Sequence, residues 1–215
     1  MTTVCLQGGN ELTPPCRHMD ERLLELAPSS RVVVVPLASK PGADYQRTGA
    51  HATAYLSALG ADVVVAPDAR RDPGGAAAAV TGAGLVVLTG GSPRQLVDGL
   101  TRSGLDAVIR TATANGAVVM GASAGAMVAC ATTLLPQWHR DPLVGEGIGL
   151  VKGYVVVPHF DGKRTAWVRV ALGAAATVLG IPERSGVLVE DGRLTALGAE
   201  PTAVITAEGR QELPL

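Results

Sequence analysis

The chain has 215 residues, and this length fits one domain with a large core better than two full domains. Hydrophobic residues make up 47% of the chain and charged residues only 17%, so a disordered polar chain is excluded. The 18 Lys and Arg residues nearly balance the 19 Asp and Glu residues, and there is no basic run, so we expect neither a nucleic-acid partner nor a membrane partner. We therefore predict a single domain over residues 1–215.

Short runs of β-branched and other apolar residues predict strands along the whole chain. Because these runs are continuously apolar rather than alternating with polar residues, they are typical of parallel strands that are buried on both faces. The predicted strands are Thr3–Leu6, Arg31–Val35, Asp62–Ala66, Leu85–Thr89, Ala117–Met120, Tyr154–Val157, Val187–Val189 and Ala203–Thr206.

Segments with helical character lie between most of these strands, and the alternation is typical of βαβ units and an α/β fold. The predicted helices are Cys16–Ala27, Asp44–Leu59, Pro93–Ser103, Leu105–Ala114 and Arg164–Leu179. Gly or Pro follows most strands, and in such sheets ligands bind beyond the carboxyl ends of the strands. The glycine-rich segment from Gly145 to Gly153 predicts a mobile loop.

The cysteines and the first residues of the chain indicate in which cell compartment we expect the protein. Cys5, Cys16 and Cys130 form no CxxC pair and no Cys/His cluster, so we predict neither a disulfide framework nor a metal site. No basic stretch followed by an apolar run opens the chain, so we expect no secretory signal and a cytoplasmic location. The segment Thr111 to His139 has no formal charge, but Gly, Ser and Thr interrupt it, which favours a buried strand, turn and helix over a membrane span.

The segment from Gly121 to Gly125 has the sequence GASAG and stands between a predicted strand and a helical run. This context predicts a nucleophile elbow, in which a serine in a strained turn needs small neighbours two residues before and after it. Ser123 is then the candidate nucleophile, and the Ala124 N–H is a candidate oxyanion donor at a helix N-terminus. A turn of small residues without a catalytic role is the alternative.

A serine hydroxyl needs a base, and four histidines are available. His18 and His51 lie in polar helical stretches, which favours surface positions for both. His139 lies in a loop that no strand fixes. His159 follows a predicted strand at its carboxyl end, on the same side of the sheet as Ser123, and this position favours it as the base. No histidine follows His159, so the Ser, acid, His order of an α/β-hydrolase is absent.

Two carboxylates are candidates for the acid that orients the imidazole. Asp161 lies two residues beyond His159, and Glu183 lies in the turn between the last predicted helix and the following strand. Glu190 and Asp191 lie in a hairpin-like turn, and we interpret them as solvated. The residues themselves leave the choice between Asp161 and Glu183 open.

Several segments, in this order and approximate spacing, together resemble one family: Leu6–Asn10, Leu88–Ser92, Gly121–Ala126, Val157–Phe160 and Gly180–Glu183. The sequence resembles peptidase family S51, the serine peptidases that include dipeptidase E and cyanophycinase. The resemblance implies a three-layer α/β sandwich with a mostly parallel central sheet, which is the class I glutamine amidotransferase-like, flavodoxin-like fold.

The resemblance also implies roles for particular residues. Ser123 is expected to be the nucleophile, His159 the base and Glu183 the orienting acid. The Gly91 N–H is expected to join the Ala124 N–H in the oxyanion hole. No metal and no organic cofactor are implied.

The chain departs from the family after its second Gly-Gly pair. The family often continues there with Asn-Thr or Asp-Gln, whereas this sequence has Ser92-Pro93-Arg94. Because that region lines the substrate site in the family, Ser92 and Arg94 are candidate substrate-binding residues. Arg164 resembles an arginine near the site of dipeptidase-like members, where a guanidinium can hold a substrate carboxylate. A solvated position on a helix surface is the alternative for Arg164.

The expected function is hydrolysis of a small peptide or isopeptide bond, at an aspartyl residue, by a cytoplasmic serine peptidase similar to the S51 dipeptidases or cyanophycinases. The alternatives are an amidase or esterase for a non-peptide small molecule and a non-catalytic binding protein on the same scaffold. Glutaminase activity is disfavoured because that class has cysteine at the elbow. The expected partner is a small peptide or amide substrate, and the sequence is compatible with a homodimer.

Overall fold

The computed structural model describes residues 2–175 and 177–215. A seven-stranded sheet forms its centre, with the strand order β11-β10-β1-β5-β4-β2-β3. The neighbouring strands that run parallel are β1 (Thr3–Gln7), β5 (Val118–Ala122), β4 (Leu85–Leu88), β2 (Arg31–Val35) and β3 (Asp62–Val65). At the other edge, β10 (Ser185–Glu190) and β11 (Arg193–Gly198) add antiparallel. The prediction of an α/β fold with a mostly parallel central sheet is confirmed.

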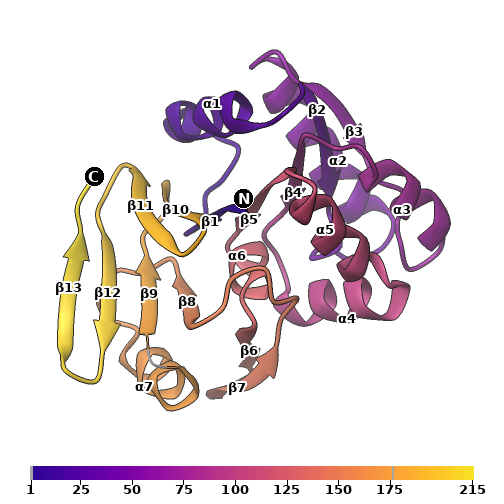
Figure 1. Ribbon diagram of the computed structural model, residues 1–215. Coiled ribbons are helices and arrows are strands. Elements are labelled where there is room, and N and C mark those ends of the chain that lie inside the picture. Colours follow the sequence, from indigo (N-terminus) through magenta and orange to yellow (C-terminus); the bar gives the residue numbers. More distant parts are fainter. Residues whose placement is uncertain (1, 176) are drawn as a thin grey trace.

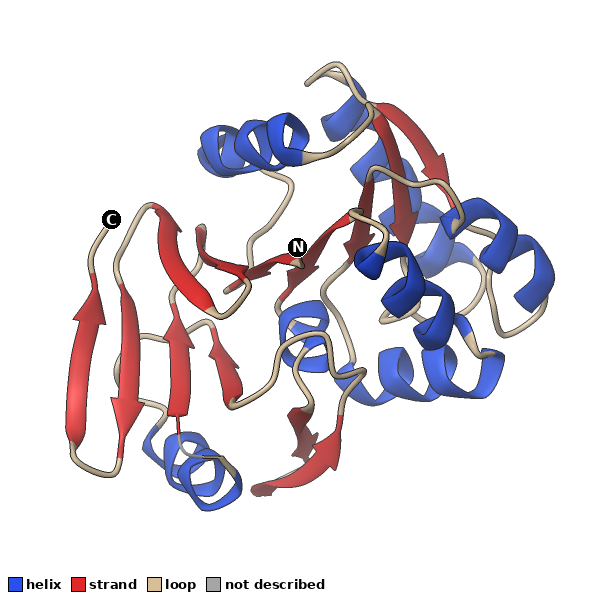
Figure 2. Cartoon of the chain, in the orientation of Figure 1, coloured by secondary structure: helices blue, strands red, loops and turns tan. Residues whose placement is uncertain are grey.

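Helices flank the central sheet (Figure 2). On one face the core includes side chains of α1 (Arg17–Leu26) and α2 (Ala43–Ser57), and the 3₁₀ helix η1 (Pro14–Cys16) leads into α1. On the other face lie α3 (Pro73–Val80), α4 (Pro93–Ser103), α5 (Leu105–Ala114) and α6 (Ala124–Ala129). The valines of β2 alternate between these two cores, since Val32 and Val34 belong to the first and Val33 and Val35 to the second. Burial on both faces therefore explains the continuously apolar strands.

A second, four-stranded sheet lies beside the central one and is coloured orange to yellow in Figure 1. Its order is β13-β12-β9-β8, with β8 (Tyr154–Pro158), β9 (Thr177–Ile181), β12 (Thr202–Thr206) and β13 (Gly209–Leu213). β8 and β9 are parallel, and α7 (Thr165–Ala174) lies between them in the chain. β6 (Thr132–Gln137) and β7 (Arg140–Glu146) form a separate two-stranded hairpin.

The predicted helix Arg164–Leu179 is wrong at its C-terminal end, where residue 176 lies outside the described residues. α7 ends at Ala174, and β9 begins at Thr177. The short apolar run Val178-Leu179 fits either a helix or a strand, and pairing with β8 and β12 decides for the strand. The carboxyl end of β9 therefore leads directly into the turn that carries Glu183.

The segment from Gly145 to Gly153, for which we predicted a mobile loop, is held by contacts with the rest of the chain. β7 covers the start of this segment, and the Gly147 N–H then donates to the Ala131 carbonyl. The side chains of Ile148 and Val151 are buried in the core. Close packing explains Gly145 and Gly147, because a Cβ at either would overlap a neighbouring residue. Gly149 and Gly153 have open space around them and positive φ values, which favour glycine.

Candidate active site

Three side chains from distant parts of the chain form a continuous hydrogen-bonded series. Ser123 Oγ lies 2.9 Å from His159 Nε2, and His159 Nδ1 lies 2.9 Å from Glu183 Oε1. When the Nδ1–H of the imidazole donates to Glu183, Nε2 is left to accept the proton of the serine hydroxyl. We call this series the Ser–His–Glu triad.

Ser123 occupies the turn between β5 and α6 in a left-handed conformation, with φ 47° and ψ −104°. A Cβ at Gly121 would lie 2.6 Å from the backbone of Gly125, and a Cβ at Gly125 would overlap the Leu88 carbonyl oxygen. The two glycines therefore allow β5 to turn abruptly into α6. The strained serine between them is the backbone feature that presents a nucleophile at an elbow.

His159 and Glu183 follow the parallel strands β8 and β9 of the second sheet, so their turns lie at the same edge of that sheet. The expectation that His159 follows a strand of the same sheet as Ser123 is wrong, because β8 pairs with β9 and not with the central sheet. His159 also has a left-handed backbone, with φ 49°. The triad is thus assembled from the carboxyl ends of strands in both sheets.

The end of β1 connects the three turns that carry the triad. The carbonyl of Gln7 accepts the Ser123 N–H at 2.9 Å, and the carbonyl of Gly8 accepts the His159 N–H at 2.8 Å. The carbonyl of Gly9 accepts the N–H of Arg184, the residue after Glu183, at 2.9 Å. We call these three consecutive carbonyls the carbonyl platform.

Close packing explains the two glycines of the platform. A Cβ at Gly9 would overlap the imidazole of His159, and a Cβ at Gly8 would overlap the carbonyl oxygen of Pro182. Gly9 also has a φ of 122°, which other residues adopt rarely. Sequence analysis did not assign this role, although the Gly-Gly pair directly after the first strand is a signal for close backbone approach.

The structure brings Glu183, and not Asp161, to the imidazole. Asp161 is exposed, and its Oδ1 accepts the Lys163 N–H within its own turn at 2.9 Å. That backbone N–H lowers the pKa of the Asp161 carboxyl below its ordinary value. Its carboxylate is therefore engaged locally rather than with His159.

The other histidines lie apart from this series. His18 is fully exposed beside Glu21 on α1, and His51 Nε2 lies 3.1 Å from the Leu12 carbonyl oxygen. His139, in the turn of the β6–β7 hairpin, has its ring edge-on to Trp138 with the centroids 5.0 Å apart.

Two backbone N–H groups in the turns after β4 and β5 are candidates for an oxyanion hole. Within residues 2–175 and 177–215, neither the Gly91 N–H nor the Ala124 N–H donates a hydrogen bond to a backbone carbonyl. Both follow adjacent parallel strands, since Leu88 of β4 is opposite Gly121 of β5. Gly91 has a φ of 135°, and a Cβ there would lie 2.6 Å from the Ala38 carbonyl oxygen. The turn is therefore restricted to glycine.

Glu11 holds the same glycine turn from the other side. Its Oε1 accepts the Gly90 N–H at 2.7 Å, across 79 residues of sequence. A Cβ at Gly90 would meet this oxygen at 2.6 Å. The contact fixes the segment before Gly91, and no pattern in the sequence indicated it.

The candidate substrate residues have more local contacts. Ser92 Oγ accepts the Gln95 N–H at 3.3 Å and so caps α4, while Arg94 is exposed on the first turn of that helix. The Arg164 guanidinium lies 5.4 Å from the centroid of the Trp167 ring and is half-buried. These contacts are a helix cap and a cation–π pair.

The cysteines are not alternative nucleophiles. Cys5, Cys16 and Cys130 are buried free thiols. Burial raises the pKa of all three thiols, that of Cys130 to about 12, and therefore suppresses the reactive thiolate.

Within the described residues, no group of three His, Cys, Asp or Glu side chains is arranged to hold a metal ion. Over the same residues, no helix combines the length and the apolar content that a membrane span requires.

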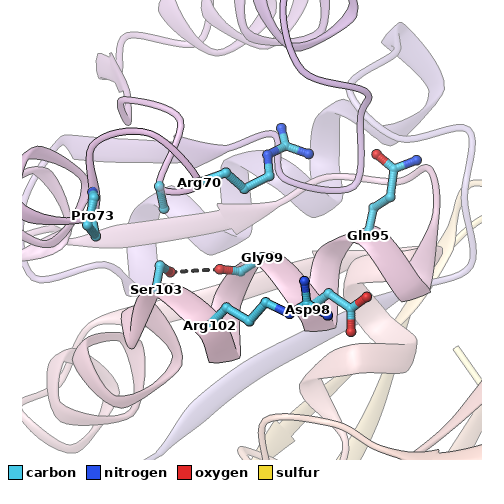
Figure 3. Close-up of a pocket in the computed structure, with 8 residues that line it drawn as sticks. Arg70, Pro73, Gln95, Asp98, Gly99, Arg102 and Ser103 are labelled. Atoms are coloured by element: carbon cyan, nitrogen blue, oxygen red, sulfur yellow. Dashed lines mark hydrogen bonds between the residues drawn. The ribbon is translucent and has the colours of Figure 1, made fainter.

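A cavity of about 480 Å³ lies between α4 and the loop after β3, and Figure 3 shows residues that line it. Arg70 lies on the loop side, and Gln95, Asp98 and Arg102 project from α4. The Arg70 guanidinium is already held by two hydrogen bonds to the Asp68 carboxylate and one to the Ser39 carbonyl. The triad residues do not line this cavity.

An elbow serine, an imidazole and a carboxylate in series on an α/β scaffold define the class of serine hydrolases. Comparison with known proteins identifies the family within this class. Residues 4–197 match peptidase family S51. The chain belongs to this family of serine peptidases, as the sequence segments indicated.

Curated relatives named peptidase E support this membership. Peptidase E of Citrobacter koseri is 33% identical over 151 residues, which are 64% of this chain and 65% of that protein. Peptidase E of Escherichia coli strain K12 / DH10B is 30% identical over the same shares. The match therefore spans 65% of the length of these relatives.

Two crystal structures share the fold. A peptidase from an acI-B1 Actinobacterium superposes with a TM-score of 0.85 at 20% identity, covering 100% of this chain and 94% of that one. A putative peptidase E from Listeria monocytogenes EGD-e superposes with a TM-score of 0.67 at 16% identity, covering 93% of this chain and 100% of that one. At these identities the likeness concerns the fold.

Proposed function

We propose that this chain hydrolyses a small peptide or isopeptide bond at an aspartyl residue, with Ser123 as nucleophile, His159 as base and Glu183 as orienting acid. The observation that carries the proposal is the pair of 2.9 Å contacts that join these three side chains in series. The peptidase E relatives support a peptide as the substrate.

The geometry supports a two-step acyl transfer. Ser123 Oγ attacks the carbonyl carbon of the substrate while its proton moves to His159 Nε2, and the negative oxygen that forms is stabilised by the N–H groups of Gly91 and Ala124. The imidazolium then donates its proton to the departing amine, which leaves an ester on Ser123. A water molecule, deprotonated by His159, attacks this ester, and the proton returns to Ser123 when the acid is released. Glu183 holds the imidazole by Nδ1 throughout.

Labelling with a fluorophosphonate tests the mechanism without knowledge of the substrate. We expect covalent modification of Ser123 alone, located by peptide mapping, because only an activated serine attacks the probe at a useful rate. Ser123→Ala should abolish labelling and lower turnover by several orders of magnitude while the fold is retained. Ser103→Ala, on the far end of α4, is the control and should label as the wild type does. Labelling that survives in the Ser123 variant refutes the mechanism.

Arg164 and Arg94 are the candidates to hold a substrate carboxylate. If Arg164 does so, Arg164→Ala should raise KM for aspartyl dipeptides roughly tenfold or more, because a charge-assisted contact is worth about 1.5–3 kcal/mol. A neutral side chain cannot form that contact, so the effect on neutral substrates should be smaller. Arg94→Ala is the parallel variant, and kcat and KM are measured for both substrates. If Arg164→Ala lowers kcat/KM equally for aspartyl and neutral substrates, Arg164 has a structural role through its contact with Trp167.

A further inference from the structure

Asp20 is a buried carboxylate that the proposed reaction does not use. It lies on α1 and is only 1% exposed. Its Oδ1 accepts the Nε2–H of Gln7 at 2.9 Å, and its Oδ2 accepts the hydroxyl proton of Tyr55 at 2.9 Å. The carboxylate therefore joins one residue of β1 to one residue of α2.

Most titratable groups around Asp20 are acids, and the Arg17 guanidinium, which acts on the neighbouring Tyr55, forms its ion pair with Glu21. The titratable groups that act on it are Tyr55 on α2, Cys5 on β1, and Cys16 and Glu11 in the segment before α1. Among the described residues, no Lys, Arg or His forms an ion pair with it. Burial raises the pKa of Asp20 to about 6, so the charged form is costly in this place. A costly group that is nevertheless fully hydrogen-bonded suggests a task other than stability.

The partner of Asp20 points to that task. Gln7 is the last residue of β1, and its own carbonyl is the first of the carbonyl platform that receives the Ser123 N–H. The next two carbonyls receive the N–H groups of His159 and Arg184. Gln7 is 1% exposed, and its Oε1 has no partner among the described residues. The Asp20 carboxylate accepts from its Nε2, and the Cys5 thiol is a weaker hydrogen-bonding neighbour of the amide. A shift of the Gln7 side chain would therefore be transmitted to all three triad turns.

We propose that Asp20 is a positioning residue for the triad and acts through Gln7. It touches neither the substrate nor the reacting atoms. By holding the Gln7 amide, Asp20 fixes the position of the carbonyl platform. The platform in turn fixes the 2.9 Å contacts of His159 with Ser123 and with Glu183. This inference rests on the proposed role of Ser123 as the nucleophile.

The experiment compares two substitutions at Asp20. Asp20→Ala removes the carboxylate that accepts the Gln7 Nε2–H, and we expect kcat to fall about tenfold with KM within about twofold, because small misplacements of reacting groups act on the chemical step. Asp20→Asn keeps an oxygen that accepts the Gln7 Nε2–H, and the Tyr55 hydroxyl can turn to accept from the new amide. We expect kcat of Asp20→Asn within about threefold of the wild type. The rescue separates positioning by a hydrogen bond from an effect of the charge.

A matched control separates positioning from a general loss of stability. Thr113 is also 1% exposed, and its hydroxyl donates to the Ile109 carbonyl within α5. Thr113→Val removes this buried hydrogen bond at a site unconnected to the platform, and we expect unchanged kcat. An equal fall of kcat in Thr113→Val would overturn the proposal, since the loss would then follow stability.

Three further results would also overturn it: kcat of folded Asp20→Ala within twofold of the wild type, Asp20→Asn as slow as Asp20→Ala, or Gln7→Met with unchanged kcat. Gln7→Met removes the amide without burying a new charge, so it decides the question if Asp20→Ala does not fold. Failure of the proposed function looks different. In that case the wild type itself shows no labelling at Ser123, whereas failure of this inference alone leaves wild type and variants labelled at equal rates.

Discussion

Glu183 is the most exposed member of the triad, with 47% of its side chain accessible against 34% for His159. Water and salt screen the attraction between exposed charges, so a half-exposed carboxylate stabilises an imidazolium less than a buried one does. In the proposed mechanism, its main contribution is therefore to hold the ring by Nδ1. A glutamine can still accept that N–H, which makes the substitution informative.

Glu183→Gln should lower kcat/KM by about 10- to 100-fold, which is less than the roughly 10⁴-fold loss known for buried triad acids. Asp161→Asn should stay within about twofold, because Asp161 bonds to its own turn. The measurement is kcat/KM for an aspartyl dipeptide, with circular dichroism to check that each variant is folded. The opposite ranking would make Asp161 the orienting acid.

At the scale of single residues, the sequence predicts those site residues whose position depends on a local sequence pattern. Ser123 was identifiable because its strained turn requires glycines on both sides. The choice between Asp161 and Glu183 was not accessible from the residues alone, because it depends on β8 and β9 being parallel neighbours. The contact between Glu11 and Gly90 spans 79 residues and leaves no local trace in the sequence.

At the scale of elements, the start of α4 carries both the Gly91 turn and the helix cap. Ser92 Oγ accepts the Gln95 N–H, which satisfies one of the free N–H groups in the first turn. Ser92→Ala should lower the free energy of unfolding by about 1 kcal/mol, with KM unchanged. Urea unfolding and steady-state kinetics measure the two quantities. Ser57→Ala, at the exposed end of α2, is the control and should change the stability by less than about 0.5 kcal/mol. A rise in KM for the Ser92 variant would instead assign its hydroxyl to the substrate.

The elements that sequence reasoning missed have weak local signatures. Pro136 interrupts the run of β6, and a proline inside such a run argues against a strand. β13 has the sequence GRQEL and is mostly exposed, so it lacks an apolar face that would reveal it. Pairing with β7 and with β12 stabilises these strands, and that pairing is a property of the tertiary structure.

At the scale of the whole molecule, Asp20 links folding to pH. Its pKa rises from 3.8 to about 6 on burial, so between these values the folded state binds more protons than the unfolded state. The free energy of unfolding therefore falls as the pH rises through this window. Well below pH 3.8 the carboxyl is protonated in both states, and the cost disappears.

Asp20→Asn removes this titration. The stability of the variant relative to the wild type should increase from pH 4 to pH 7 by up to about 3 kcal/mol, from a pKa difference of about two units. Urea unfolding of both proteins at steps of half a pH unit measures the difference, and other carboxyls cancel in the comparison. Parallel stability curves would mean that Asp20 titrates alike in both states.

The fold class was accessible from the sequence, whereas the two-sheet arrangement was not. Continuously apolar strands such as β2 indicate burial under helices on both faces, and this signal does not depend on strand order. The separation of β8 and β9 from the central sheet depends on which edges pair, and a run such as Tyr154–Pro158 has the same appearance in either sheet.

The central position of β1 affects when the central sheet can form during synthesis of the chain. β1 is synthesised first, but its two neighbours in the sheet begin at Val118 and Ser185. At roughly 5–20 residues per second on the ribosome, synthesis of β5 begins about 6–22 s after β1 has been made. Synthesis of β10 begins about 9–36 s after β1. Ser123 likewise emerges about 3–12 s before Glu183. A nascent chain therefore carries Ser123 before Glu183, and the proposed triad cannot form until residue 183 has been made.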